Sequence, residues 1–230
     1  MILFTSMVLV GCTVLNPLQS EADVPEDISA PPDAVSAATE ERYREGELRE
    51  FDDVKLDPAV GPRDNSIKGT QQVDLTTYQL TVDGLVDQPM NYAYEDAVAL
   101  PSEQRLITIY CVEGWNATIL WKGVTMQTLL DAAKVQDSAN TVIFHAADGY
   151  TTSLPLQEIL DNNLMLAYDA NGIALPPEMG FPFMFVAEDK WGYKWARWVN
   201  RIELSDDASY KGYWESRGYD NDAVLGRPFS

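Results

Sequence analysis

The stretch Leu106-Ile107-Thr108-Ile109-Tyr110-Cys111-Val112-Glu113-Gly114-Trp115 is a β-branched, apolar run that ends in a thiol followed by a Glu-Gly turn. Such a run is typical of a strand, and the turn places Cys111 at the mouth of that strand. The only other cysteine, Cys12, lies near the N-terminus. A lone thiol in this position can be a soft metal ligand, a nucleophile or a small buried apolar residue, and this choice decides the function.

Outward from this stretch, short strands and short helices follow one another without a regular period. Strands are expected over residues 77–84, 105–111, 141–145, 150–154, 164–168, 183–186 and 198–204, and helices over 92–100, 125–133 and 156–160. The absence of a βαβ period and of repeats favours an α+β fold with mixed sheets and short helices. The chain contains no Gly-rich dinucleotide fingerprint and no phosphate loop, which argues against nicotinamide chemistry and nucleotide hydrolysis.

The first 62 residues are expected to precede the folded domain. Residues 1–15 form an apolar segment whose Leu9-Val10-Gly11-Cys12 resembles a lipoprotein processing site, with Cys12 as the acylated residue. The Lys or Arg that usually precedes such a segment is missing, so a frayed apolar terminus is the alternative. The lipoprotein interpretation implies an extracytoplasmic protein that is anchored to a membrane by lipid.

Residues 16–62 have the composition of an acidic flexible linker, and residues 63–230 are expected to form one domain. The chain carries 16 basic and 36 acidic residues, a formal net charge of −20. Such a charge repels nucleic acid, so nucleic acid is excluded as a partner.

The sequence gives little support for a hydrolase with a Cys–His pair or for a zinc site. The chain has one histidine, His145, which a Cys–His hydrolase would need within hydrogen-bond reach of Cys111. A zinc site built on these two residues would need two carboxylates in addition. The plain alternative for His145 is a strand residue with a satisfied hydrogen bond.

A cluster of cations stands out in this acidic chain. The segment Lys190-Trp191-Gly192-Tyr193-Lys194-Trp195-Ala196-Arg197-Trp198 places three cations between aromatic residues. Lys194 and Arg197 are suited to a phosphate group through charge-assisted hydrogen bonds. The alternative is an amphipathic segment whose cations only extend their heads to water.

Six ordered blocks together resemble the sulfite oxidase superfamily of molybdopterin-dependent oxidoreductases. The first block is Cys111-Val112-Glu113-Gly114-Trp115 together with Trp121-Lys122-Gly123-Val124, and the second is Asp148-Gly149-Tyr150-Thr151-Thr152-Ser153-Leu154. The later blocks are Leu166-Ala167-Tyr168 with Asn171-Gly172, Gly180-Phe181-Pro182, Gly192-Tyr193-Lys194 with Arg197-Trp198, and Gly212-Tyr213-Trp214-Glu215. The cysteine block is closer to the bacterial methionine sulfoxide reductase type than to animal sulfite oxidase.

The resemblance implies a sulfite-oxidase-type fold that binds a molybdenum–molybdopterin cofactor. It implies that Cys111 is the catalytic metal ligand and that Asn65, Lys68, Lys194, Trp195, Ala196 and Arg197 contact the cofactor. The implied activity is two-electron oxygen-atom transfer on a small sulfoxide- or sulfite-like molecule. Electrons would be exchanged with a separate redox protein, such as a membrane haem protein or a quinone-linked one.

Two departures from the family pattern lie around Pro182. Met179 stands where His or Asn is usual, and Met184 stands where Arg is usual. Ala146 likewise replaces a hydroxyl residue. The two methionines would remove polar groups at or near the pocket, and they favour the rival interpretation, a non-catalytic ligand-binding module on the same fold. Metal content and turnover of sulfoxides or a redox dye would distinguish the two.

Overall fold

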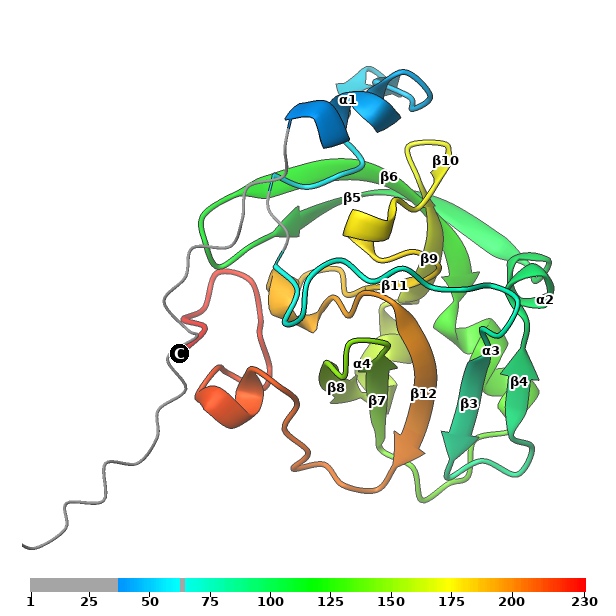
Figure 1. Cartoon of the computed structure of the whole chain (residues 1–230). Helices are drawn as coiled ribbons and strands as arrows, with labels where there is room; N and C mark the ends of the chain where they lie inside the picture. The colour runs from blue at the N-terminus through cyan, green and yellow to red at the C-terminus, as the bar shows by residue number, and fades with distance from the viewer. Residues whose placement is uncertain (1–36, 63–64) are drawn as a thin grey trace, which may run out of the picture. The chain divides into compact units, whose positions relative to one another are not determined.

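Two five-stranded sheets form the core of the computed structural model, which describes residues 37–62 and 65–230 (Figure 1). The first sheet has the order β10-β9-β6-β5, and β11 pairs with β9 beside this path. The second has the order β4-β3-β12-β7-β8. In the second sheet β12 runs parallel to β3 and antiparallel to β7, so the sheet is mixed. The predicted α+β class is confirmed.

The first sheet contains β5 (Ser102–Tyr110), β6 (Asn116–Thr125), β9 (Met165–Ala170), β10 (Ile173–Ala174) and β11 (Met184–Val186). The second contains β3 (Leu80–Gly84), β4 (Met90–Tyr92), β7 (Thr141–Ala146), β8 (Thr151–Pro155) and β12 (Val199–Ser205). The longer helices are α1 (Ala37–Arg44), α2 (Tyr94–Val98), α3 (Met126–Ala133) and α4 (Leu156–Asp161). Single turns of 3₁₀ helix are η2 (Pro177–Met179), η3 (Gly192–Lys194) and η4 (Glu215–Arg217).

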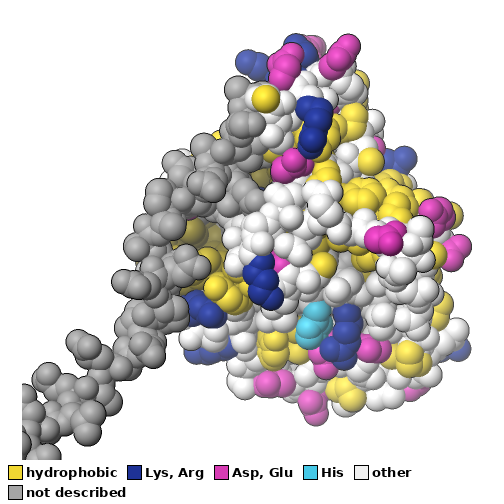
Figure 2. Space-filling view, in the orientation of Figure 1, with side chains coloured by type: hydrophobic (Ala, Val, Ile, Leu, Met, Phe, Trp, Pro, Cys, Tyr) yellow, Lys and Arg dark blue, Asp and Glu magenta, His cyan; other side chains and the backbone are white. Residues whose placement is uncertain are grey.

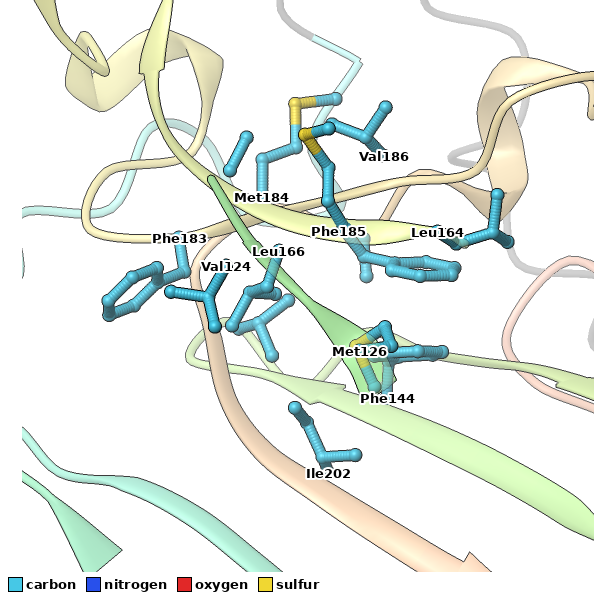
Figure 3. Close-up of a cluster of buried hydrophobic side chains, with 14 of the residues drawn as sticks. Val124, Met126, Phe144, Leu164, Leu166, Phe183, Met184, Phe185, Val186 and Ile202 are labelled. Atoms are coloured by element: carbon cyan, nitrogen blue, oxygen red, sulfur yellow. The ribbon is translucent and has the colours of Figure 1, made fainter. Parts of the chain in front are cut away.

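The hydrophobic core lies where the two sheets face each other. Figure 3 shows Phe185 of β11 close to Phe144 of β7, with Ile202 of β12 nearby. The two phenyl rings stack with their centroids 3.8 Å apart. Burial of such large apolar side chains is the main favourable term in folding, at about 25 cal/mol per Å² of apolar surface. Alternating apolar residues in the sequence supply this face from both sheets.

Helix α3 begins where the sequence predicts it. The Thr125 hydroxyl accepts a hydrogen bond from the Thr128 N–H at 3.3 Å, the arrangement of a helix N-cap. Leu129 and Leu130 are buried on the inner face of the helix, as expected from their spacing.

Strand β6 is the largest element that the sequence analysis did not predict. It pairs with β5 over its whole length and with β9 on the other side, so it lies inside the first sheet. A register shift interrupts the β6–β9 pairing between Lys122 and Gly123. A Cβ atom on Gly123 would lie 2.3 Å from the Leu166 carbonyl oxygen, so only glycine permits this close approach. Glycine and lysine inside the strand hide its alternating pattern.

Residues 37–62 differ from the expected flexible linker. They form α1 and a small hairpin of β1 (Glu50–Phe51) and β2 (Val54–Lys55). Leu56 and Ala59 are fully buried, and they belong to the same compact unit as the two sheets. These two apolar residues and the buried carboxylate of Glu47 hold this acidic segment on the domain. The expected 1–15 segment and the rest of the expected linker lie outside the described residues.

Candidate functional site

Cys111 lies in a tight loop between β5 and β6. Its N–H donates to the Trp115 carbonyl at 2.9 Å, and its own carbonyl accepts from the Gly114 N–H at 3.1 Å. Gly114 has a φ of 87°, a left-handed conformation that glycine adopts without strain. The loop turns the thiol inward, and the residue is 8% exposed. The sequence therefore located the thiol correctly, at the end of a strand.

Two polar side chains flank the thiol. The Asn65 side-chain amide donates to Cys111 Sγ over 3.5 Å. The Glu113 carboxylate oxygen Oε2 lies 4.0 Å from the same sulfur, and the Trp115 indole N–H donates to that oxygen at 3.3 Å. An amide N–H and a carboxylate thus lie next to the sulfur. Glu113 and Trp115 were not predicted as site residues. Their position in the same short turn as Cys111 is the sequence signal that could have indicated it.

The segment around η3 forms a second wall beside the thiol. Trp191 and Tyr110 form an isolated parallel bridge, which brings η3 alongside the end of β5. A Cβ atom on Gly192 would lie 3.1 Å from the Tyr110 carbonyl oxygen and 3.6 Å from the Cys111 Cα atom. Gly192 is therefore needed for this close backbone approach.

Lys68 lies at the turn between β7 and β8. A Cβ atom on Gly149 would lie 3.3 Å from the Lys68 Nζ atom. The Asp148 carboxylate accepts from the Tyr150 N–H at 2.9 Å and holds this turn. The segment of residues 65–68 thus runs from the thiol to the β7–β8 turn, and it carries both Asn65 and Lys68.

The structure differs from the sequence interpretation at Lys194. Its side chain is fully buried, and its Nζ donates to the Ser153 carbonyl at 2.9 Å, the Glu215 carboxylate at 2.6 Å and the Asn221 side-chain oxygen at 3.2 Å. An ammonium group has three donors, and these partners occupy all of them. Burial lowers the pKa of Lys194, and the Glu215 charge opposes that shift. Lys194 therefore acts as one half of a buried ion pair and has no donor left for a phosphate.

Trp195 and Ala196 are core residues. The Trp195 ring packs against Trp121 at a centroid distance of 5.7 Å, and its indole N–H donates to the Lys190 carbonyl at 3.2 Å. Ala196 is fully buried. Their side chains fill the interior behind η3, so any contribution to a cofactor site comes through the backbone that they hold.

Arg197 is half-buried and points toward η2. Its guanidinium Nη1 donates to the Glu178 carbonyl at 2.9 Å. A Cβ atom on Gly180 would lie 2.9 Å from the Arg197 Cβ atom, so the glycine makes room for the arginine. Of the predicted cation pair, Arg197 is the partly exposed member and Lys194 the fully buried one.

The two methionines that the sequence places at or near the pocket are buried, and the Met179 methyl group and the Trp115 ring both lie beside Gly61. Met179 is 1% exposed and Met184 is fully buried, and both belong to the hydrophobic core. Met184 is paired with Ala167 across β11 and β9, and Figure 3 shows its side chain among apolar neighbours. An unpaired charge in such a position would carry a large desolvation cost, whereas methionine fills irregular apolar space. Ala146 is also buried, at 6% exposure.

His145 lies on the outer surface of the second sheet, beside basic and acidic side chains (Figure 2). Its Nε2 atom is 2.8 Å from Glu203 Oε2, and the Arg201 guanidinium bonds the same carboxylate oxygen at 2.9 Å. The ring nitrogen is thus engaged with a carboxylate on the neighbouring strand, which supports the structural role of His145 and removes the reason for a Cys–His hydrolase.

Comparison with known proteins identifies relatives of this chain. Residues 67–214 match the family described as oxidoreductase molybdopterin binding domain. The uncharacterized oxidoreductase YuiH of Bacillus subtilis is 39% identical over 147 residues, which cover 64% of this chain and 74% of that protein. The putative protein-methionine-sulfoxide reductase subunit YedZ1 of Azospira oryzae is 33% identical over 150 residues, 65% of this chain and 56% of that protein.

More distant matches agree on the fold. The protein-methionine-sulfoxide reductase catalytic subunit MsrP of Ralstonia nicotianae is 29% identical over 145 residues, 56% of this chain and 44% of that protein. The sulfane dehydrogenase SoxCD from Paracoccus pantotrophus has a TM-score of 0.60 at 20% identity, over 88% of this chain and 58% of that one. The chain thus spans about half the length of the relatives named for methionine sulfoxide. In the described part of the chain, every helix is too short or too polar to cross a membrane.

Proposed function

The chain belongs to the oxidoreductase molybdopterin binding domain family, and from this premise we propose that the enzyme reduces a small sulfoxide with electrons from a separate redox protein. The observation that carries the proposal is the environment of Cys111. The thiol is buried between an amide donor, Asn65, and a carboxylate, Glu113. Two of the relatives are named for methionine sulfoxide, which supports a sulfoxide over sulfite as the substrate class.

The residues around Cys111 fit a molybdenum–molybdopterin group. A thiolate is a soft ligand and suits a metal whose other ligands come from the cofactor. The Asn65 Oδ1 atom is buried and has no hydrogen-bond partner within the described residues, although buried polar atoms are normally paired. A cofactor next to the thiol would satisfy this acceptor. Lys68 and Arg197 are the predicted cations that are not fully buried, and they would hold the anionic part of the group.

The chemistry requires two electrons and two protons for each sulfoxide that becomes a thioether and water. The cofactor, when bound, supplies the two-electron redox change and the transfer of the oxygen atom. Cys111 serves as a thiolate ligand, and the Asn65 amide orients its sulfur. The Glu113 carboxylate lies beside the thiol, and the Trp115 indole N–H fixes the orientation of that carboxylate.

The rival interpretation, a non-catalytic binding module, is weakened by the burial of two methionines. That interpretation depended on Met179 and Met184 as pocket residues, and both are buried in the core. The other residues assigned to the site, Asn65, Lys68, Glu113 and Arg197, are polar or charged.

The direct test is the metal content and turnover of the full chain, purified from a host that makes molybdopterin. We expect about one molybdenum per chain, because one thiolate is available as a ligand. We also expect reduction of dimethyl sulfoxide or methionine sulfoxide by a reduced redox dye. A metal-loaded protein that oxidises sulfite but leaves sulfoxides untouched would contradict the proposed substrate and direction. A protein that binds no molybdenum in this host would contradict the proposal as a whole.

We also propose that the protein is extracytoplasmic and anchored through a lipid on Cys12. The support is the Leu9-Val10-Gly11-Cys12 pattern, which lies outside the described residues. A diacylated residue gives stable membrane binding, whereas a single chain binds only marginally. Cells that express the protein with Cys12→Ala are therefore expected to move it from the membrane pellet to the soluble fraction, while Thr13→Ala leaves it in the pellet. Equal membrane fractions for the two variants would contradict the anchor.

A further inference from the structure

The segment of residues 37–62, here called the strap, lies across the domain and ends close to Cys111. We infer that the strap holds Asn65 against the thiol, and that Glu47 is the buried positioning residue that anchors it. This inference rests on the Cys111 site that the proposed function uses. It assigns a role to residues that precede the family match at residue 67.

The anchor is a carboxylate whose two oxygens are both engaged. The Glu47 side chain is fully buried, and its Oε2 accepts from the Ala59 N–H at 2.7 Å and from the Asn171 side-chain amide at 3.1 Å. Its Oε1 accepts from the Arg44 guanidinium at 2.8 Å. Glu47 thus ties both ends of the strap to each other and to the domain. Hydrogen bonds to a buried charged group are among the stronger ones.

Asn171 connects this anchor to the first sheet. It sits in the turn between β9 and β10, and its side-chain oxygen accepts from the Leu120 N–H of β6 at 3.0 Å. Its side-chain amide also donates to the Asp57 carbonyl of the strap at 2.8 Å. Its own carbonyl accepts from the Leu48 N–H at 2.8 Å. The strap is therefore attached to β6, the strand that follows the Cys111 loop.

The second half of the strap follows β6 toward the thiol. The Asp57 N–H donates to the Thr118 carbonyl at 2.9 Å, and the Thr118 N–H donates to the Asp57 carboxylate at 2.8 Å. Further along, a Cβ atom on Gly61 would lie 3.4 Å from the Trp115 ring. Trp115 in turn bonds Glu113, and Asn65 reaches the sulfur itself. The strap thus contacts the loop of Cys111 at Trp115 and ends three residues before Asn65, a polar neighbour of the thiol.

A further polar tie of the strap, at its N-terminal end, is much more exposed. Arg42 pairs with Glu178 at 2.9 Å, but the Arg42 side chain is 59% exposed. Surface ion pairs contribute little to stability because water screens them and because long side chains lose entropy. Glu47 is accordingly the buried charged anchor of the strap, and its loss is expected to loosen the strap and, with it, Asn65.

The test measures alkylation of Cys111 by iodoacetamide in the full chain, made in a host that lacks molybdopterin. A Cys12→Ser background leaves Cys111 as the only thiol. Glu47→Ala is expected to raise the alkylation rate by about tenfold, because local opening controls access to a buried group. Glu45→Ala is the matched control, since it removes an exposed glutamate from the same segment, and it is expected to leave the rate unchanged. Glu47→Gln keeps one acceptor oxygen and is expected to restore part of the protection.

A double-mutant cycle then shows whether Glu47 acts through Asn65. In an Asn65→Ala background, Glu47→Ala is expected to add little further increase, because the two changes remove the same cover from the thiol. Circular dichroism and the unfolding midpoint of each variant confirm that the domain is folded. A folded Glu47→Ala protein with wild-type alkylation, or a rate increase that multiplies fully with that of Asn65→Ala, would overturn the inference. Because the readout needs no cofactor, its failure is distinct from a failure of the proposed activity.

Discussion

Replacement of Cys111 by serine is expected to yield a folded protein that contains almost no molybdenum and has almost no sulfoxide reductase activity. Serine has nearly the shape of cysteine, but its hydroxyl is a hard and weakly acidic ligand that does not replace a thiolate on a soft metal site. We expect kcat/KM to fall on the order of 10³-fold or more, at least as much as the loss of one transition-state hydrogen bond in other enzymes.

The measurement is molybdenum per chain together with dye-linked sulfoxide reduction, for wild type and Cys111→Ser from the same host. Tyr110→Phe is the matched control, because Tyr110 directly precedes the thiol and its side chain is 40% exposed. It should keep both metal and activity. Equal molybdenum in wild type and Cys111→Ser would mean that the metal ligand lies elsewhere.

Replacement of Lys194 by methionine is expected to produce the largest loss of stability among the predicted changes. The variant keeps most of the side-chain volume but leaves the Glu215 carboxylate buried without its counter-ion. Removal of one partner from a buried ion pair typically costs about 3–5 kcal/mol. For a chain of this size that corresponds to a fall in Tm of roughly 10 °C. Denaturant unfolding of the cofactor-free protein measures this loss directly.

Two further variants make this experiment decisive. Lys211→Met is the control, because Lys211 is an exposed lysine near Glu215 in the chain. The double variant Lys194→Met with Glu215→Leu should recover much of the stability, since no buried charge then remains without a partner. If Lys194 instead bound a phosphate of the cofactor, Lys194→Met would lower cofactor occupancy and leave the stability of the cofactor-free protein unchanged.

Local patterns in the sequence predicted most of the elements correctly. Strands with clear alternation, such as β7 and β12, and the capped helix α3 lie within a few residues of the expected ranges. The end of β5 at Tyr110 placed Cys111 correctly, because a β-branched run followed by a Glu-Gly turn has few other conformations available. Strand β6 was missed because its Gly123 serves the close approach to β9, and neither the partner nor the approach can be seen locally.

The role of the cations could not be predicted from their own segment. A lysine between aromatic residues suits a phosphate site and a buried ion pair equally well, and the choice depends on what lies opposite. For Lys194 the partners are Ser153 and Glu215, which are 41 and 21 residues away in sequence. The same limit applies to the strap, where the partner of Glu47 is Asn171, 124 residues further along.

The sequence by itself determined the α+β class, the family and the position of the thiol, because these depend on residue order within short blocks. The tertiary structure decided which charged side chains are available for binding and which are buried. It placed Lys194 in an ion pair, Met179 and Met184 in the core, and the Glu47 carboxylate between the acidic strap and Asn171. The physical reason is that desolvation and hydrogen bonding depend on distant parts of the chain, which meet only after folding.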